Sequence, residues 1–173
     1  ITGVSIPSGG NAAFIYQADI NDYAPLAATG NVINTVRVTG AQLAAPLTAT
    51  HTISTATVPN LSIVKGICPA QIAENGRITY TFSIQNYGNT ATDDDLVQIR
   101  DTFTPILSDI SVTYNGTVLP TSNYSYDQAT GVFSTNAGVI NIPAATYVQS
   151  QTTGAYTLTP GTATVTVTGN ISG

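Results

Sequence analysis

The fold class is clearest in Ala163-Thr164-Val165-Thr166-Val167-Thr168-Gly169, close to the end of the sequence. Small or branched apolar residues occupy every second position of this stretch up to Val167, and threonines fill the positions between them. A period of two is typical of a β-strand that has one buried and one solvated face. Threonine favours the same interpretation, because its β-branched side chain fits a pleated sheet and loses rotamer freedom in a helix.

The same alternation continues through most of the chain, and no segment keeps an apolar stripe of period 3.6 for three helical turns. We therefore expect an all-β protein whose short strands are separated by turn-forming residues. The expected strands are Ala13–Ala18, Val32–Thr39, Thr48–Thr57, Leu61–Ile67, Ile78–Gln85, Leu96–Phe103, Ile110–Tyr114, Tyr124–Tyr126, Val132–Ser134, Val139–Ile142 and Ala163–Val167. Many short strands of this kind predict an antiparallel sandwich or barrel.

Two turns are specific enough to predict individually. Asn115-Gly116 separates two short runs with strand character, and an Asn-Gly pair readily adopts positive φ, so it predicts a tight hairpin. The second turn is the segment Asp127–Gly131, in which Gly131 is placed for a left-handed bulge residue.

An internal repeat narrows the architecture. Asn34–Gly40 resembles Ala163–Gly169, and Gly3–Ser8 resembles Gly138–Ala144. We therefore expect a tandem repeat of an immunoglobulin-like antiparallel β-sandwich, a fold of about 100 residues, in which the first copy is incomplete.

The boundary between the two copies is predicted at Val58-Pro59-Asn60. Residues 60–173 are the complete copy, and residues 1–59 are the back half of a repeat whose front half is absent from the chain. Half a sandwich cannot cover its own apolar faces. Residues 1–59 must therefore pack on the second domain, pair with another chain, or add to an open sheet edge as a donated strand.

Composition excludes several classes of partner. Charged residues make up only 8% of the 173 residues, against roughly a quarter in an ordinary soluble domain, and the net charge is -5. The basic residues are scattered, so we expect no binding to nucleic acid, and no apolar run approaches the ~18 residues of a membrane-inserted helix. Cys68 is the only cysteine, which excludes an internal disulfide, and it is expected to be a buried or partly buried thiol.

Three segments carry a resemblance to a known family. They are Leu61–Pro69, which contains a lysine and ends in proline, Glu74–Asn89, which contains Gly before Thr-Tyr-Thr and an Asn-x-Gly-Asn turn, and Val97–Phe103, which includes Asp-Thr. Together they resemble the conserved-repeat family called domain of unknown function eleven. The resemblance implies tandem extracellular sandwiches on bacterial or archaeal surface proteins, in a variant similar to those of Gram-positive spore formers, and it implies no active site.

Lys65 and Asp101 are the ionisable residues that the alternation directs inward. Lys65 shares its parity with Ile63 and Ile67, and Asp101 shares its parity with Ile99. Burying either charge alone costs several kcal/mol, so the two side chains are expected to form a semi-buried ion pair.

A sharper alternative is an intramolecular isopeptide bond, in which a neutral Lys65 attacks an asparagine carboxamide that a protonated Asp101 polarises. The asparagine is uncertain: Asn86 has inward parity but adjoins a turn, and Asn170 is on the outward parity. Asn34 has the inward parity in the incomplete copy.

The remaining candidates for chemistry are weak. Asp93, Asp94 and Asp95 could contribute to a calcium loop, but three consecutive carboxylates cannot all converge on one ion, so a solvated loop is the stronger interpretation. His51 is the only histidine, lies among threonines and has no triad or metal motif around it. We therefore expect neither a catalytic residue nor a cofactor.

These observations favour a non-catalytic structural module of an extracellular cell or spore surface, such as a stalk, an appendage fibre or a coat subunit. Its expected partners are further copies of itself, or neighbouring domains of the same protein, through sheet edges and domain ends. The alternative is an adhesin that binds a glycan or a protein with the loops at one end of the sandwich.

Overall fold

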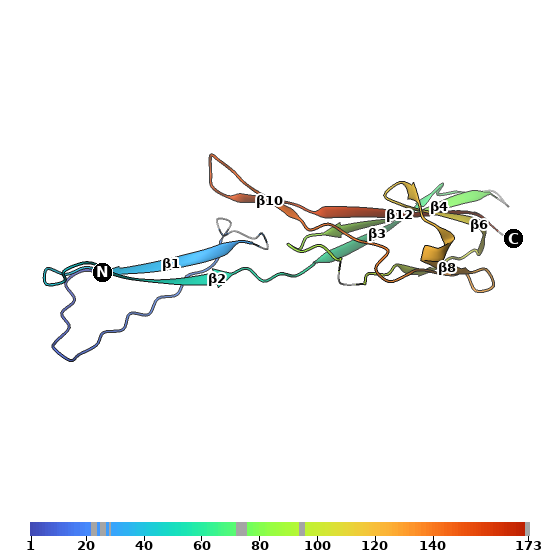
Figure 1. Ribbon diagram of the computed structural model, residues 1–173. Coiled ribbons are helices and arrows are strands. Elements are labelled where there is room, and N and C mark those ends of the chain that lie inside the picture. The colour runs from blue at the N-terminus through green and yellow to red at the C-terminus, as the bar shows by residue number, and fades with distance from the viewer. Residues whose placement is uncertain (22–23, 25–26, 28, 72–75, 94–95, 172–173) are drawn as a thin grey trace.

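A computed structural model of the chain describes residues 1–21, 24, 27, 29–71, 76–93 and 96–171. Its regular elements are the strands β1 to β12 and one short 3-10 helix, and every strand pairing is antiparallel. Figure 1 shows a β-sandwich at one end of an elongated molecule and a separate hairpin at the other. The prediction of an all-β antiparallel fold is confirmed.

The larger sheet of the sandwich has five strands in the order β3-β4-β12-β6-β7. These strands are β3 (Leu61–Cys68), β4 (Arg77–Asn86), β12 (Gly161–Ile171), β6 (Leu107–Tyr114) and β7 (Thr117–Val118). The long strand β12 lies in the middle, between β4 and β6, and β3 forms one edge of the sheet.

The smaller sheet has three strands in the order β5-β9-β8. They are β5 (Arg100–Thr102), β9 (Val132–Thr135) and β8 (Tyr124–Asp127), and the 3-10 helix η1 (Thr121–Asn123) leads into β8. The predicted strand Leu96–Phe103 is therefore wrong in extent, since only its last part pairs with β9.

The core lies between these two sheets and follows the alternation of the sequence. In β12 the side chains of Ala163, Val165 and Val167 are buried, and the intervening threonines face away from the core. The inward residues of β4 are buried in the same way, and Tyr80 stacks on Phe103 with 4.7 Å between the ring centroids. Aromatic pairs of this kind add to the stabilisation that burial of their area gives.

The segment Val139–Ile142 was predicted as a strand, and the structure corrects this. Ile140 and Ile142 are fully buried, but the segment belongs to no sheet. Its backbone is held instead by Thr92, whose Oγ1 accepts from the Ile142 amide at 2.9 Å and whose amide donates to the Ile142 carbonyl at 3.1 Å. The alternation of apolar residues predicted which side chains are buried. Whether the segment pairs as a strand depends on an adjacent strand, which the alternation does not identify.

Both predicted turns are confirmed. Asn115 and Gly116 have φ angles of 47° and 79°, and the turn joins β6 to β7. Gly131 has a φ of 75° and ends the turn between β8 and β9. A Cβ at Gly131 would lie 2.5 Å from the Phe103 carbonyl oxygen, so this position requires glycine on steric as well as conformational grounds.

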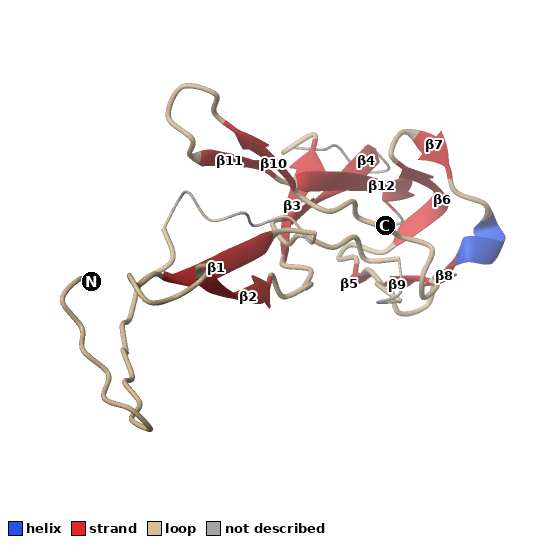
Figure 2. Ribbon diagram, turned by 60° about the vertical axis from the view of Figure 1, so that its left-hand side comes forward, coloured by secondary structure: helices blue, strands red, loops and turns tan. Residues whose placement is uncertain are grey.

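Two hairpins project from the sandwich (Figure 2). One is formed by β10 (Thr146–Gln149) and β11 (Tyr156–Thr159), which the sequence analysis missed. The other is formed by β1 (Asn31–Val38) and β2 (Leu47–Ser54), whose residues are all exposed. Among the described strands β1 pairs with β2 alone, whereas its predicted counterpart β12 lies between two strands, so the tandem repeat is not confirmed and stays a prediction.

The connection from the β1–β2 hairpin to the sandwich is held by Asn89. Its Nδ2 donates to the Ala56 carbonyl at 2.8 Å, and its Oδ1 accepts from the Val58 amide at 3.1 Å. The backbone of Val58–Asn60 also packs closely on Gly88, where a Cβ would lie 2.2 Å from the Val58 carbonyl oxygen. The predicted boundary at Val58-Pro59-Asn60 thus falls in the segment that leads into β3.

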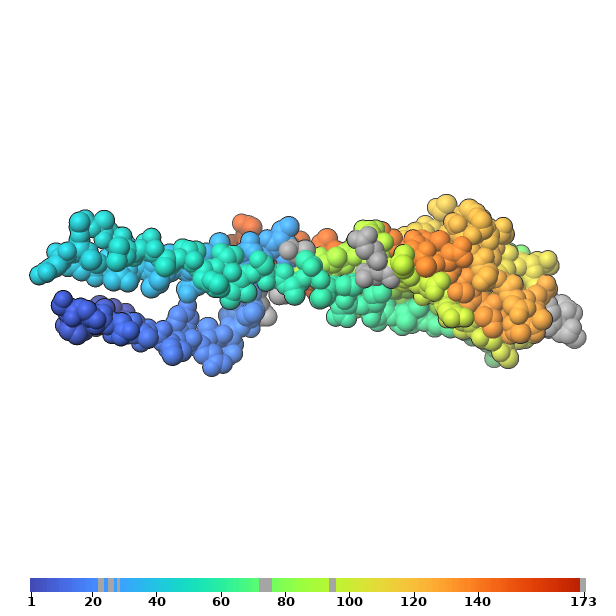
Figure 3. Space-filling view, turned by 60° about the horizontal axis from the view of Figure 1, so that its bottom comes forward, coloured from blue at the N-terminus to red at the C-terminus, as the bar shows by residue number. Residues whose placement is uncertain are grey.

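Residues 1–21 precede the β1–β2 hairpin and are exposed throughout. The prediction of a strand at Ala13–Ala18 is wrong for this structure, because the segment belongs to no sheet. The space-filling view in Figure 3 shows the start of the chain, in dark blue, alongside the hairpin end of the molecule and apart from the sandwich.

Candidate functional site

The most unusual surface of the molecule is strand β3. Its residues are all exposed, although it pairs along its whole length with β4, whose inward side chains are buried. Ile63 lies opposite Ile84 in the register, and Ile67 lies opposite Tyr80, so both side chains are on the inner face of the sheet. They are nevertheless 56% and 52% exposed. Much of the inner face of β3 is therefore apolar and left open by the described residues.

The inner face of β3 is uncovered because the smaller sheet ends at β5. β5 pairs with β9 on one side, and among the described strands none pairs with its other side. A groove of about 330 Å³ follows from this arrangement. Its lining comes from β3, from β4 and from β5 with the segment that follows it: Lys65, Gly66, Ile67, Tyr80, Thr102 and Thr104.

An ion pair between Lys65 and Asp101 lies in this groove. The Lys65 ammonium contacts Oδ2 of Asp101, and the two side chains are 41% and 19% exposed. Oδ1 of Asp101 accepts from the Thr102 amide at 2.9 Å, while the buried Oδ2 has no hydrogen-bond partner in the described structure and meets only the lysine charge. The structure thus brings together the two residues that the alternation directed inward.

Aromatic rings of the core support the same ammonium group. Nζ of Lys65 lies 4.7 Å from the ring centroid of Tyr80, 5.6 Å from that of Phe103 and 5.8 Å from that of Phe82. Each distance is within the range of cation–π attraction. The lysine charge is therefore stabilised both by the aromatic rings and by the Asp101 carboxylate.

The asparagines considered for an isopeptide bond lie elsewhere. Asn86 is fully buried in β4, opposite Leu61 and not opposite Lys65. Asn170 is on β12, which β4 separates from β3, and its Nδ2 donates to Asp109 at 3.3 Å. Asn34 pairs with His51 in the β1–β2 hairpin. This arrangement gives Lys65 no amide partner among the three.

Asn86 has a structural role that sequence reasoning missed. Its Oδ1 accepts from the amides of Asn60 at 3.0 Å and Gly88 at 2.9 Å. Its Nδ2 donates to the carbonyls of Thr90 at 2.8 Å and Pro143 at 3.0 Å. One buried amide thus joins the start of β3, the turn after β4 and the segment before β10. Its place as the first residue of the Asn-x-Gly-Asn turn was the available signal.

The other candidate residues that the structure describes do not gather into a cluster. Asp93 is exposed, Asp94 and Asp95 lie outside the described residues, and no group of three or more metal-ligating side chains occurs in the part of the chain that is described. Cys68 was expected to be buried or partly buried and is exposed, because it ends the edge strand β3. The described residues also contain no helix of the length and apolarity that a membrane crossing requires.

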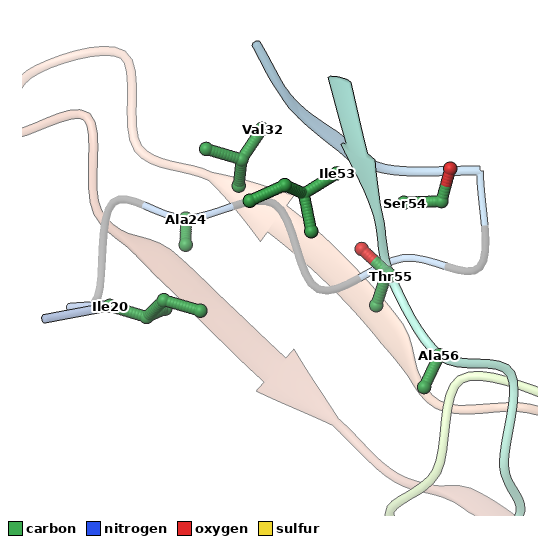
Figure 4. A pocket seen from close by; sticks show the side chains of 7 residues that line it. All are labelled: Ile20, Ala24, Val32, Ile53, Ser54, Thr55 and Ala56. Atoms are coloured by element: carbon green, nitrogen blue, oxygen red, sulfur yellow. The ribbon is translucent and has the colours of Figure 1, made fainter. Parts of the chain in front are cut away.

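A second apolar surface lies on the β1–β2 hairpin. One face carries apolar residues of both strands together with the pair Asn34 and His51. The opposite face carries four threonines, two of which hydrogen-bond at 3.0 Å. The apolar positions are Val32, Val36, Val38, Leu47, Ala49 and Ile53. At its base Ile20 points toward Val32 and Ile53 and borders a hollow of about 190 Å³ (Figure 4).

Comparison of the chain with protein-family models, curated protein sequences and solved structures found no match in any of the three. The predicted relationship to the domain of unknown function eleven therefore rests on the quoted segments alone.

Proposed function

We propose that this chain is a non-catalytic structural module of an extracellular surface protein, and that it assembles with further copies through its sheet edges. The observation that carries the proposal is the uncovered inner face of β3. An exposed strand edge and an exposed apolar face are each a template for association, and β3 has both. In the same chain, the β1–β2 hairpin and residues 1–21 expose apolar side chains of their own.

The charge composition supports the same proposal. Natural proteins protect a free edge strand with lysine, proline or inward-pointing charge. On β3 the only charged side chain is Lys65, and Asp101 already neutralises it. The remaining apolar residues of β3 are thus available for contact with a partner.

Sedimentation velocity of the purified full chain over a wide concentration range tests this function, combined with electron microscopy of the concentrated sample. We expect concentration-dependent association and fibres or ordered arrays. A monodisperse monomer at every concentration that also binds specific glycans on an array would contradict the proposal and favour the adhesin.

A further inference from the structure

The groove between β3 and β5 lies beside an edge of β5 that no described strand pairs with. We propose that residues 13–18 of a second copy of this chain add as a strand to the free edge of β5 and cover the inner face of β3. This inference rests on the proposed function and names the two surfaces that meet.

The acceptor lacks one strand. The larger sheet has five strands and the facing sheet has three. Among the described strands none pairs with the second edge of β5, and contacts of β5 with Lys65 and the groove place β5 near β3. A strand added there would lie about 4.8 Å from β5 and about 10 Å above β3, the normal spacings within and between sheets. Ile63 and Ile67 would then become part of the core, as the equivalent residues of β4 already are.

The donor has strand character and lacks a partner. In Ala13–Ala18 the side chains of Phe14 and Tyr16 share one parity and Ile15 has the other, and all three are exposed. No hydrogen bond joins this segment to another described residue. Addition to β5 would give the backbone of Ala13–Ala18 hydrogen-bond partners and would bury apolar side chains of the segment.

The position of the donor points to a second copy and not to the same molecule. Figures 1 and 3 show residues 1–20 running beside the β1–β2 hairpin, at the end of the molecule away from the groove. The donated and accepting surfaces differ, so the contact is heterologous. A heterologous contact repeats from copy to copy and gives a fibre unless the rotation closes a ring.

The ion pair at the centre of the groove is compatible with being covered. Burying an ion pair costs less than burying a lone charge, because the attraction between the partners offsets part of the desolvation. Lys65 already contacts Asp101 and lies over the rings of Tyr80 and Phe103. An added strand would therefore bury a neutralised pair between two apolar residues.

Disulfide trapping between separate copies tests the contact directly. In a Cys68→Ala background, one set of variants carries Ala13→Cys, Ile15→Cys or Gln17→Cys, and the other carries Thr102→Cys at the rim of the groove. Equal mixtures are oxidised and separated without reductant. We expect at least one donor position to give a mixed dimer with Thr102→Cys well above the dimer that either variant forms alone. Val118→Cys, on the opposite edge of the sandwich, is the acceptor control and should give none.

Matched glutamates test the face that is covered. Ile67 and Val64 are both exposed on β3, but Ile67 is on the inner face and Val64 on the outer. Ile67→Glu should weaken self-association by more than about tenfold, because it buries an unpaired carboxylate, whereas Val64→Glu should not. In the donor, Phe14→Glu should act like Ile67→Glu, and Gln17→Glu should be neutral.

Three results would overturn the inference. One is trapping that is no stronger in the mixture than in each variant alone. The second is an intramolecular cross-link in a dilute variant that carries a donor cysteine and Thr102→Cys in one chain, which would show that the segment covers the groove of its own molecule. The third is equal weakening by Val64→Glu and Ile67→Glu. If the chain still forms fibres in these cases, the proposed function stands and only this contact is wrong.

Discussion

At the scale of single residues, Asn86 joins distant parts of the sandwich through its side-chain amide. Its four hydrogen bonds are made inside the protein, to groups that come from three separate segments. Asn86→Ala would leave two amides and two carbonyls without these partners, and each buried unsatisfied group costs about 1–3 kcal/mol. We expect a loss of at least about 3 kcal/mol in the free energy of unfolding, measured by urea denaturation. Asn11→Ala, on an exposed residue, is the control and should change nothing.

Asp127 gives the sandwich a local dependence on pH. The side-chain hydrogen bond from Thr130, followed by the backbone hydrogen bond from Ala129, lowers the pKa of this carboxyl below its ordinary value of 3.8. A folded-state pKa that is lowered contributes stability above the ordinary value, and this contribution is lost as the pH falls through the folded pKa.

The expected result is that Asp127→Asn is less stable than the wild type at neutral pH and that the difference shrinks as the pH falls below 3.8. Urea midpoints of both proteins across acidic pH measure it. Thr130→Val removes the larger cause of the lowered pKa, so it should reduce the difference in part. A constant difference at every pH would show that Asp127 acts by another route.

At the scale of elements, alternation predicted which residues share a face but not whether that face is covered. It placed the buried residues of β4 and β12, because both strands lie in the middle of the larger sheet. The same pattern in β3 and in Ala13–Ala18 predicted strands with a buried face, and the structure leaves both exposed. Whether a face is covered depends on the order of strands in the sheets, and this order is set by pairing between strands that are far apart in the sequence.

The ion pair could be predicted from the sequence, whereas the role of Asn86 could not. The inward direction of Lys65 and of Asp101 follows from parity, because each prediction needs only that residue's own strand to be regular. The role of Asn86 depends on where Asn60 and Pro143 lie, and these residues are far apart in the sequence. Exposure of Cys68 likewise follows from the edge position of β3, which its local sequence does not reveal.

The β1–β2 hairpin should be less stable in the dilute chain than the two sheets of the sandwich. Its strands pair only with each other, and an isolated two-stranded hairpin is marginally stable in water. We expect its amides to exchange with deuterium much faster than those of β4 and β12, as mass spectrometry of short peptides would show. Exchange in the hairpin as slow as in β4, measured on a monomeric sample, would contradict this.

At the scale of the whole molecule, the chain is elongated (Figure 1). It exposes apolar side chains both on the β1–β2 hairpin and on β3 of the sandwich, and only 8% of its residues are charged. Copies of a chain with a net charge of -5 repel one another, so the attraction between them must come from apolar contact and strand pairing. The proposed assembly therefore differs from one held together by ion pairs, in which charge would attract the copies and not repel them.

Salt and temperature distinguish the two kinds of assembly. Raising the ionic strength from about 0.01 M to about 0.15 M shortens the Debye length from about 30 Å to about 8 Å, which screens the repulsion between copies. We therefore expect self-association, measured by sedimentation velocity, to strengthen or stay constant with added salt. Warming from cold to room temperature should strengthen it too, because apolar association is weaker in the cold. Association that weakens steeply with salt would show that charge pairs hold the copies together, and the apolar groove at β3 would not be the main contact.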